Sequence, residues 1–260
     1  MSALARLASR AALAVGFVFL YGPILVLAAM SFNASRLVTV WGGFSTKWYS
    51  ALLENAALLE SAKISLEAAA VSATLATVLG LCAAAALTRF GAFRTRSLFF
   101  GAVHAPLVLP EVVLGLALLS AFVAFGFDRG FVTLVIAHTT FTMCFAAVTL
   151  TSALRDLHPS QEEAAMDLGA TPLQAFALVA LPAIAPALAS AYLMAFTLSL
   201  DDLVIASFAT GPGATTLPMR IYSQVRLGVT PEVNAASTLL LAFVFSVLAV
   251  VALLRWRRAA

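Results

Sequence analysis

Several carboxylates stand inside long apolar stretches of this 260-residue chain. Glu111 directly follows Pro110 near the middle of one stretch, and Asp201 and Asp202 lie in the outer third of another. A charged side chain within a membrane span costs about 2.5–3.5 kcal/mol on insertion scales, so these residues are functional candidates by default. Carboxylates along a route favour cations and repel phosphate, sulfate or molybdate. We therefore expect them to line a path for a cation.

Aromatic side chains accompany these acids. Tyr192 and Phe196 lie one to two turns before Asp201, and Trp48 stands in the sequence ThrLysTrpTyrSer at 46–50. Aromatic faces beside carboxylates suit an extended ammonium ligand through cation–π contacts and charge-assisted hydrogen bonds. Tyr, Trp and Phe near span ends also form interfacial belts, so a belt role for Trp48 stays open.

Each acid could instead have a purely structural role, as a partner in an ion pair or as a helix cap. Glu111 could pair with His104, two helical turns away, or with a partner subunit. Pro110 cannot donate an amide and frees a carbonyl, which favours a broken helix lining a cavity and hence a pathway role for Glu111. Asp201 and Asp202 would point about 100° apart on a continuous helix. At most one of them would then face a lumen squarely, and the other would pair or cap.

Other kinds of chemistry find little support in the sequence. Cys82 and Cys144 stand in separate stretches without CxxC spacing, which predicts small apolar packers and neither a disulfide nor a metal pair. The phosphate-binding pattern GxxxxGK[ST] does not occur. An intramembrane enzyme using Asp201 and Asp202 as an acid pair is disfavoured, because adjacent residues on one helix diverge too far to share a proton. We expect this chain to contain no catalytic residue, metal or cofactor of its own.

The composition indicates where these residues stand. The chain is 62% hydrophobic and 10% charged, whereas roughly a quarter of a soluble domain is charged. Because an unpaired buried charge is costly, so few charges imply an apolar surface and an integral membrane protein. Six stretches reach the about 20 residues that a spanning helix needs. They cover approximately residues 11–30, 62–87, 97–123, 131–154, 183–208 and 235–254.

The flanks of these stretches predict the topology. The first apolar run has about 19 residues, too long for the 7–15 of a signal-peptide core, so we expect an uncleaved anchor. Nine Lys and Arg fall on the side of the N-terminus and six on the other, and the nine lie close to the span ends. Both termini and the segment 155–182 are therefore expected in the cytoplasm. The net charge of +3 reflects these arginines and implies no nucleic-acid partner.

The segment 155–182 is charged and rich in helix-ending signals, and we name it the hairpin. Ser160 and Glu163 have capping-box spacing, and Gly169 suits the left-handed position after a helix. Thr171 and Gln174 then begin a second helix. Helices this short are marginal in water, so the hairpin should dock on something. Glu163 could alternatively be only a cap, with the hairpin packed against its own spans.

The hairpin also carries a family signature. Glu163-Ala164-Ala165, with Gly169 six residues after the glutamate and Val179-Ala-Leu-Pro182 beyond, resembles the EAA loop of binding-protein-dependent ABC importer permeases. In that family the loop is the coupling helix, seated in a groove of a cytoplasmic ATPase that binds ATP and magnesium. The resemblance implies an all-α, six-span transmembrane domain of a type I ABC importer over residues 1–260. It gives coupling roles to Glu163, Ala164, Ala165, Asp167 and Gly169.

Further stretches resemble the polyamine branch of these permeases, specifically its second permease subunit. They are residues 31–36, 46–50, 196–208, 210–213, 216–226 and 228–235. The resemblance implies a bacterial inner-membrane permease for spermidine or putrescine. It would work with a periplasmic binding protein, an unlike permease and two ATPase subunits. It gives pathway or gate roles to Trp48, Glu111, Asp201 and Asp202, beside the aromatic pair Tyr192 and Phe196.

One alternative concerns the substrate, and another concerns the class of transporter. Glu111 stands where familiar members of the branch have aspartate after the proline, and the longer side chain narrows the cavity. The substrate could therefore be another small cation: an opine-like compound, another organic cation or ferric iron. A secondary transporter is disfavoured, because the sequence lacks twin halves with inverted broken helices and such a protein needs no coupling hairpin.

Overall fold

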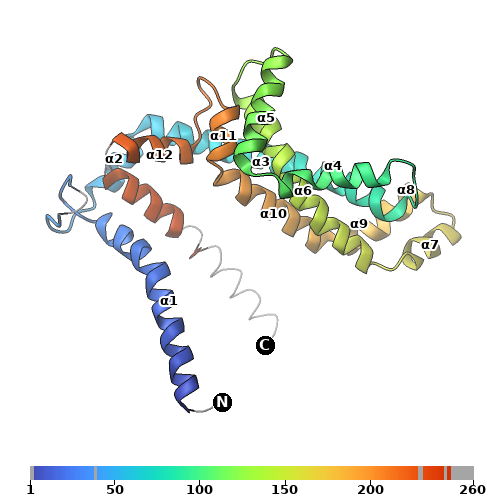
Figure 1. Cartoon of the computed structure of the whole chain (residues 1–260), viewed down its shortest axis with the longest axis horizontal. Helices are drawn as coiled ribbons and strands as arrows, with labels where there is room; N and C mark the ends of the chain where they lie inside the picture. Colours follow the sequence, from blue (N-terminus) through green and yellow to red (C-terminus); the bar gives the residue numbers. More distant parts are fainter. Residues whose placement is uncertain (1–2, 38–39, 228–230, 243–244, 247–260) are drawn as a thin grey trace. The chain divides into compact units, whose positions relative to one another are not determined.

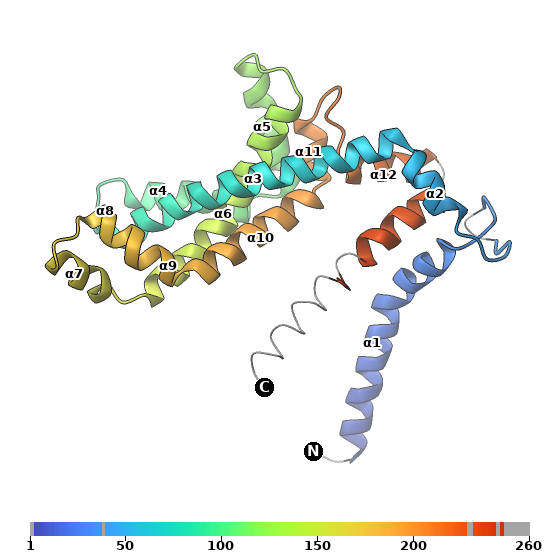
Figure 2. The ribbon, with the colours of Figure 1, turned by 180° about the vertical axis from the view of Figure 1, so that it is seen from behind.

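The computed structural model describes residues 3–37, 40–227, 231–242 and 245–246, and these are nearly all helical (Figures 1 and 2). No strand forms within these residues, whose one β-type pairing is an isolated bridge between Asn33 and Phe44. The chain divides into two compact units. One comprises Met1–Leu59 and Ile221–Ala260, and the other comprises Glu60–Arg220. The predicted all-α class is confirmed.

The first unit contains α1 (Ala3–Met30), α2 (Lys47–Glu54) and a helix over residues 231–242. The apolar stretch Ser9–Met30 is long enough to cross a membrane, and none of its most apolar part is buried within the chain. Asn33 organises the loop that follows. Its Oδ1 accepts hydrogen bonds from the amides of Ser35 and Gly42, and its Nδ2 donates to the Val40 carbonyl. This buried amide fixes the loop that leads to α2.

The second unit is built from α3 onward. Its elements are α3 (Ala56–Arg89), α4 (Arg96–Val108), α5 (Glu111–Ala124), α6 (Phe131–Asp156), α7 (Ser160–Asp167), α8 (Pro172–Ala175), the π-helix η1 (Phe176–Ala180), α9 (Leu181–Ala183), α10 (Ala185–Leu200), α11 (Val204–Ala209) and the start of α12 (Leu217–Leu227). Helix α6 is central, because it packs against α4, α10 and α11. Helix α11 also packs against α5. In both views α3, α6 and α10 run side by side (Figures 1 and 2).

Small residues let these long helices approach one another. A Cβ added to Gly80 in α3 would lie 2.8 Å from the Cβ of Ala146 in α6. Ala84, Ala146 and Ala191 are fully buried and join Leu150 in one cluster. Small residues are typical of packed membrane helices, where association depends on close backbone contact. The same packing gives the central helices a rigid frame.

The third predicted span is not one helix. The structure divides residues 97–123 into α4 and α5, which are bent by 117° at Leu109 and Pro110. Leu109 is extended, as a residue before proline tends to be, and Pro110 has no N–H with which to continue α4. The helix break that Pro110 predicted is therefore confirmed. The break makes Glu111 the first residue of α5.

The fifth predicted span is interrupted as well. The helices on either side of Ile184 are bent by 73°, and Pro186 in the first turn of α10 lacks the N–H that a continuous helix requires. Helix α10 ends at Leu200. Asp201 and Asp202 therefore do not share one continuous helix, so the angle expected from helix geometry does not apply to them. The expectation that one of the two would pair or cap is met by Asp202.

The described residues contain three helices long and apolar enough to cross a membrane, or up to five spans if each bent pair counts as one. Of the sixth predicted span, 235–254, residues 235–242 are helical and most of the rest lies outside the described residues. The arginines at 255, 257 and 258, which entered the topology prediction, also lie outside them.

Candidate functional site

The hairpin consists of α7, a turn at Gly169, and α8 with its continuation through η1 and α9. Gly169 has a φ of 95°, the left-handed conformation expected there. The Thr171 hydroxyl accepts from the Gln174 amide and the Gln174 side chain accepts from the Thr171 amide, so this capping box is confirmed. The predicted cap at Ser160 was wrong. Pro159 already has helical dihedral angles, so α7 starts one residue early and Ser160 lies within its first turn.

The outer surface of the hairpin carries the predicted coupling residues. Glu163, Ala164, Asp167 and Gly169 are exposed, and Ala165 is half-buried. Leu168 is 91% exposed and Leu173 is 78% exposed. Clustered exposed apolar side chains rimmed by charge are typical of a protein–protein contact. The hairpin therefore offers both carboxylates and leucines to a partner.

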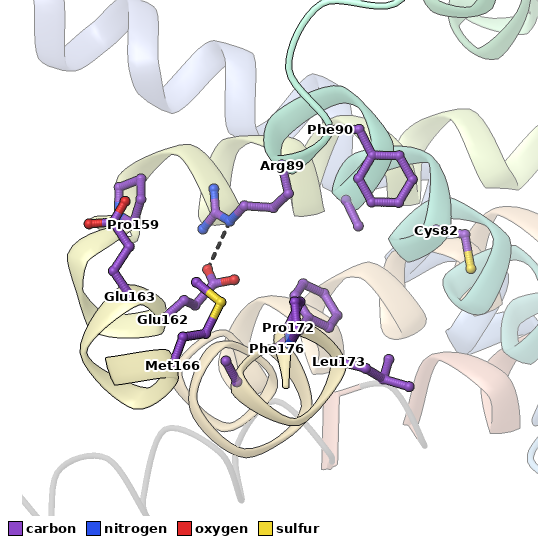
Figure 3. A pocket seen from close by; sticks show the side chains of 12 residues that line it. Cys82, Arg89, Phe90, Pro159, Glu162, Glu163, Met166, Pro172, Leu173 and Phe176 are labelled. Atoms are coloured by element: carbon purple, nitrogen blue, oxygen red, sulfur yellow. Dashed lines mark hydrogen bonds and ion pairs between the residues drawn. The ribbon is translucent and has the colours of Figure 1, made fainter. Parts of the chain in front are cut away.

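A mostly buried ion pair fastens the hairpin to α3 (Figure 3). Arg89 Nε donates to Glu162 Oε1 at 2.8 Å, and the two side chains are 16% and 11% exposed. Arg89 also donates to the Leu157 carbonyl, at 3.4 Å. Sequence reasoning singled out the exposed Glu163 and missed this contact, because the partners are 73 positions apart. The sequence did offer one signal for this contact: Arg89 stands at the end of a predicted span on the same side of the membrane as the acidic hairpin.

The same contact closes one side of a cavity of about 720 Å³ (Figure 3). The lining is mainly apolar and comes from α3, α7, α8 and η1. It includes Cys82, Phe90, Met166, Leu173 and Phe176. Cys82 and Cys144 are both free, as predicted. Cys144 is fully buried, whereas Cys82 is exposed on this cavity. Among the described residues, no group of three or more His, Cys, Asp or Glu could hold a metal ion.

Glu111 is exposed at the start of α5. His104, which could have paired with it, has its Nδ1 2.8 Å from the Phe100 carbonyl and stacks on the Phe100 ring at 4.0 Å. In the part of the chain that the structure describes, no cationic side chain lies within 4 Å of Glu111. The helix break therefore presents an acid with no cation of its own. By contrast, Lys63 and Glu67 form an exposed pair at 3.8 Å.

The two aspartates after α10 have different environments. Asp201 is exposed. Asp202 is 8% exposed, and its Oδ2 lies 3.2 Å from His138 Nε2, at ion-pair distance but out of line for a hydrogen bond. His138 Nδ1 lies 2.6 Å from the Ser199 hydroxyl. Sequence reasoning missed His138 and Ser199, although a lone histidine within an apolar stretch was a usable signal.

The aromatic side chains predicted to line the path are buried or half-buried. Tyr192 and Phe196 are half-buried and stack at 6.3 Å beside Ala73 and Ala195. Trp48 belongs to the first unit, where it is 8% exposed and its indole N–H donates to the Asn33 carbonyl at 2.6 Å. The Lys47 ammonium lies 4.7 Å from the centre of the same ring. The structure thus groups Tyr192 with Phe196, in the same unit as both aspartates and Glu111.

Comparisons with known proteins agree with the sequence signature. Residues 76–257 match the family described as binding-protein-dependent transport system inner membrane component. The chain is 54% identical over 235 residues to the putrescine transport system permease protein PotI of Escherichia coli (strain K12), a match covering 88% of this chain and 84% of that protein. It is 43% identical over 225 residues to the spermidine/putrescine transport system permease protein PotC of the same strain, covering 86% and 85%.

Among solved structures, the chain is similar to a bacterial ABC transporter involved in the import of the acidic polysaccharide alginate. The TM-score is 0.74 at 16% identity, and the match covers 98% of this chain and 96% of that one. At this identity the likeness concerns the fold alone. It confirms the predicted fold, that of the transmembrane domain of a type I ABC importer.

Proposed function

Because this chain belongs to the family of binding-protein-dependent transport system inner membrane components, we propose that it is the permease subunit of an importer that carries putrescine or spermidine. As a member of that family it is an inner-membrane transport protein, and ATP is hydrolysed by a separate ATPase. The observation that carries the substrate assignment is the 54% identity to PotI over most of both chains.

The path for the polyamine is lined by acids that have no cationic partner among the residues that the structure describes. Glu111 and Asp201 are both exposed and both stand at helix breaks, where irregular backbone can line a cavity. A linear polyammonium ion carries separated charges, so successive carboxylates can each form a charge-assisted hydrogen bond with it. The Tyr192–Phe196 stack supplies an aromatic face for the methylene segments and ammonium groups.

Coupling to ATP hydrolysis occurs through the hairpin. Glu163 and Asp167 are exposed on it, and Leu168 projects at its tip. Ala164, Ala165 and Gly169 keep this surface compact enough to enter a groove of the ATPase. Because α8, η1 and α9 lead without a long loop into α10, a displacement of the hairpin reaches the aspartates after α10. Closure of the ATPases would thereby open and close the path.

The complete transporter contains two unlike permease subunits, two ATPase subunits and a periplasmic binding protein. This chain contributes six spans as residues 11–30, 62–87, 97–123, 131–154, 183–208 and 235–254, the third and fifth of them broken. Both termini and the hairpin face the cytoplasm. The support is the position of Arg89, Arg94, Arg96 and Arg155 at the ends of apolar helices.

Uptake by intact cells tests the proposal. Accumulation of labelled putrescine and spermidine is measured with the gene present, deleted and restored. We expect uptake to be lost on deletion and regained on restoration, and competition between the two labels ranks them. Uptake that is unaffected by deletion would overturn the polyamine assignment. Opine-like compounds, other organic cations and ferric iron would then be tested in the same cells.

A further inference from the structure

A buried polar cluster ties α6 to the end of α10. His138 on α6 is 1% exposed, and Ser199 and Asp202 are 4% and 8% exposed. The histidine contacts both of them, through Nδ1 to the Ser199 hydroxyl at 2.6 Å and through Nε2 to Asp202 Oδ2 at 3.2 Å. Buried ionisable groups are costly unless they are paired and hydrogen-bonded. In this cluster the contacts with Ser199 and Asp202 supply the partners that the buried histidine requires.

Both oxygens of Asp202 are occupied by the chain itself. Oδ1 accepts from the Ile205 amide at 3.3 Å, and Oδ2 accepts from the Ala206 amide at 2.7 Å. These amides belong to the first turn of α11, whose N–H groups have no partner within the helix. The Asp202 side chain therefore caps α11. Its neighbour Asp201 makes no such contact and is exposed.

Helix α11 in turn supports the helix that begins with Glu111. Ile205 and Ala209 are buried in one cluster with Leu114 of α5. Phe208 lies so close to Gly115 that a Cβ added there would be 2.5 Å from its ring. A change at the cap of α11 is therefore passed to α5 through tightly packed side chains.

We propose that His138 is a positioning residue, which holds Asp202 as the cap of α11 and so sets the place of α5 and Glu111 along the path. On this view Asp202 does not touch the transported cation, and Asp201 is the acid of the pair that does. The proposal rests on the proposed function for the path, whereas the His138–Asp202 contact itself is independent of the substrate.

Substitutions at Asp202 separate capping from cation binding. Asparagine keeps one of the two acceptor oxygens that Asp202 offers to the amides of Ile205 and Ala206, and alanine keeps neither. We expect Asp202→Ala and His138→Ala each to lower uptake about tenfold, and Asp202→Asn to lower it clearly less than Asp202→Ala does. Uptake by the double variant, His138→Ala with Asp202→Ala, should be no lower than uptake by Asp202→Ala alone. The matched control Asp201→Asn, which neutralises the exposed neighbour, should lose uptake although the cap is untouched.

A carboxylate that binds the cation would give the opposite pattern. Uptake by the Asp202→Asn transporter would then be as low as uptake by the Asp202→Ala transporter. The ratio of spermidine to putrescine uptake would also change. Either result overturns the proposal. Uptake that survives His138→Ala at the unmodified rate would also overturn it.

Hydrogen exchange of the whole transporter in lipid nanodiscs provides a second measurement that needs no substrate. For the amides of Ile205 and Ala206, Asp202→Ala and His138→Ala should each raise the opening equilibrium about tenfold, and Asp202→Asn, which keeps one acceptor oxygen, should raise it less. Unchanged protection in Asp202→Ala or His138→Ala refutes the positioning role. If the unmodified transporter imports neither polyamine, the proposed function fails, and the exchange result still decides whether His138 and Asp202 act as described.

Discussion

Replacing Glu162 by glutamine is expected to loosen the hairpin from α3. The change removes the anionic partner of Arg89 from a contact of 2.8 Å in which the side chains are 16% and 11% exposed. Breaking a fully buried pair costs about 3–5 kcal/mol, because the remaining charge stays uncompensated. These side chains retain some solvent, so we expect about 2–3 kcal/mol here. That lowers the ratio of fastened to loosened hairpin by a factor on the order of a hundred.

The assay is the number of ATP molecules hydrolysed per polyamine imported, measured in proteoliposomes that contain the whole transporter. A loosened hairpin moves without moving α3, so Glu162→Gln and Arg89→Gln should each raise this number several-fold. Exchanging the two residues, Arg89→Glu with Glu162→Arg, should recover part of the coupling. The matched control is Glu67→Gln, which removes an exposed pair with Lys63 at 3.8 Å. Such a pair is worth at most about 0.5 kcal/mol, so coupling should not change.

Two results would refute this reasoning. In the first, Glu162→Gln couples as well as the unmodified transporter. In the second, the exchanged pair is no better than either single variant, which would mean that the two side chains act separately.

Three further substitutions test other parts of the account. Glu163→Lys should leave membrane insertion intact but abolish co-purification of the ATPase or coupled uptake; transport at the normal rate would make the hairpin purely structural. Gly169→Ala places a Cβ on a residue with a φ of 95°, which destabilises the turn by about 1–2 kcal/mol. Less ATPase should therefore co-purify with this variant, and an unchanged yield of ATPase contradicts this expectation. Gly115→Ala should lower uptake because the new methyl group meets the Phe208 ring at 2.5 Å. Adding Phe208→Leu to this variant should restore uptake. If it does not, the loss of uptake has a cause other than the contact with the Phe208 ring.

Local signals in the sequence predicted local structure well. The turn at Gly169 and the capping box of Thr171 and Gln174 depend on residues within a few positions of one another, and both formed as expected. The cap at Ser160 failed because Pro159, which has helical dihedral angles, extended the helix by one residue. The break at Pro110 was also predicted, because proline cannot continue a helix, whereas apolar length alone could not reveal that α10 ends at Leu200.

Contacts between distant segments lay beyond what the sequence could determine. Arg89 and Glu162 are 73 positions apart, and His138 and Ser199 are 61 apart, so only the packing of α3, α6 and α10 brings them together. Asp202 had a readable signal, since an aspartate shortly before an apolar run is typical of a helix start. The sequence predicted that one of the two aspartates would pair or cap, but it could not tell which one.

The most direct test of the central claim is transport by the purified system. The chain is reconstituted in proteoliposomes with its partner permease, the ATPase and the binding protein, and accumulation of labelled putrescine is followed with and without ATP. We expect accumulation that requires ATP, is competed by spermidine, and falls sharply in Glu111→Gln while the complex stays assembled. Failure of the assembled complex to accumulate either polyamine, or accumulation that proceeds without ATP, would contradict that claim.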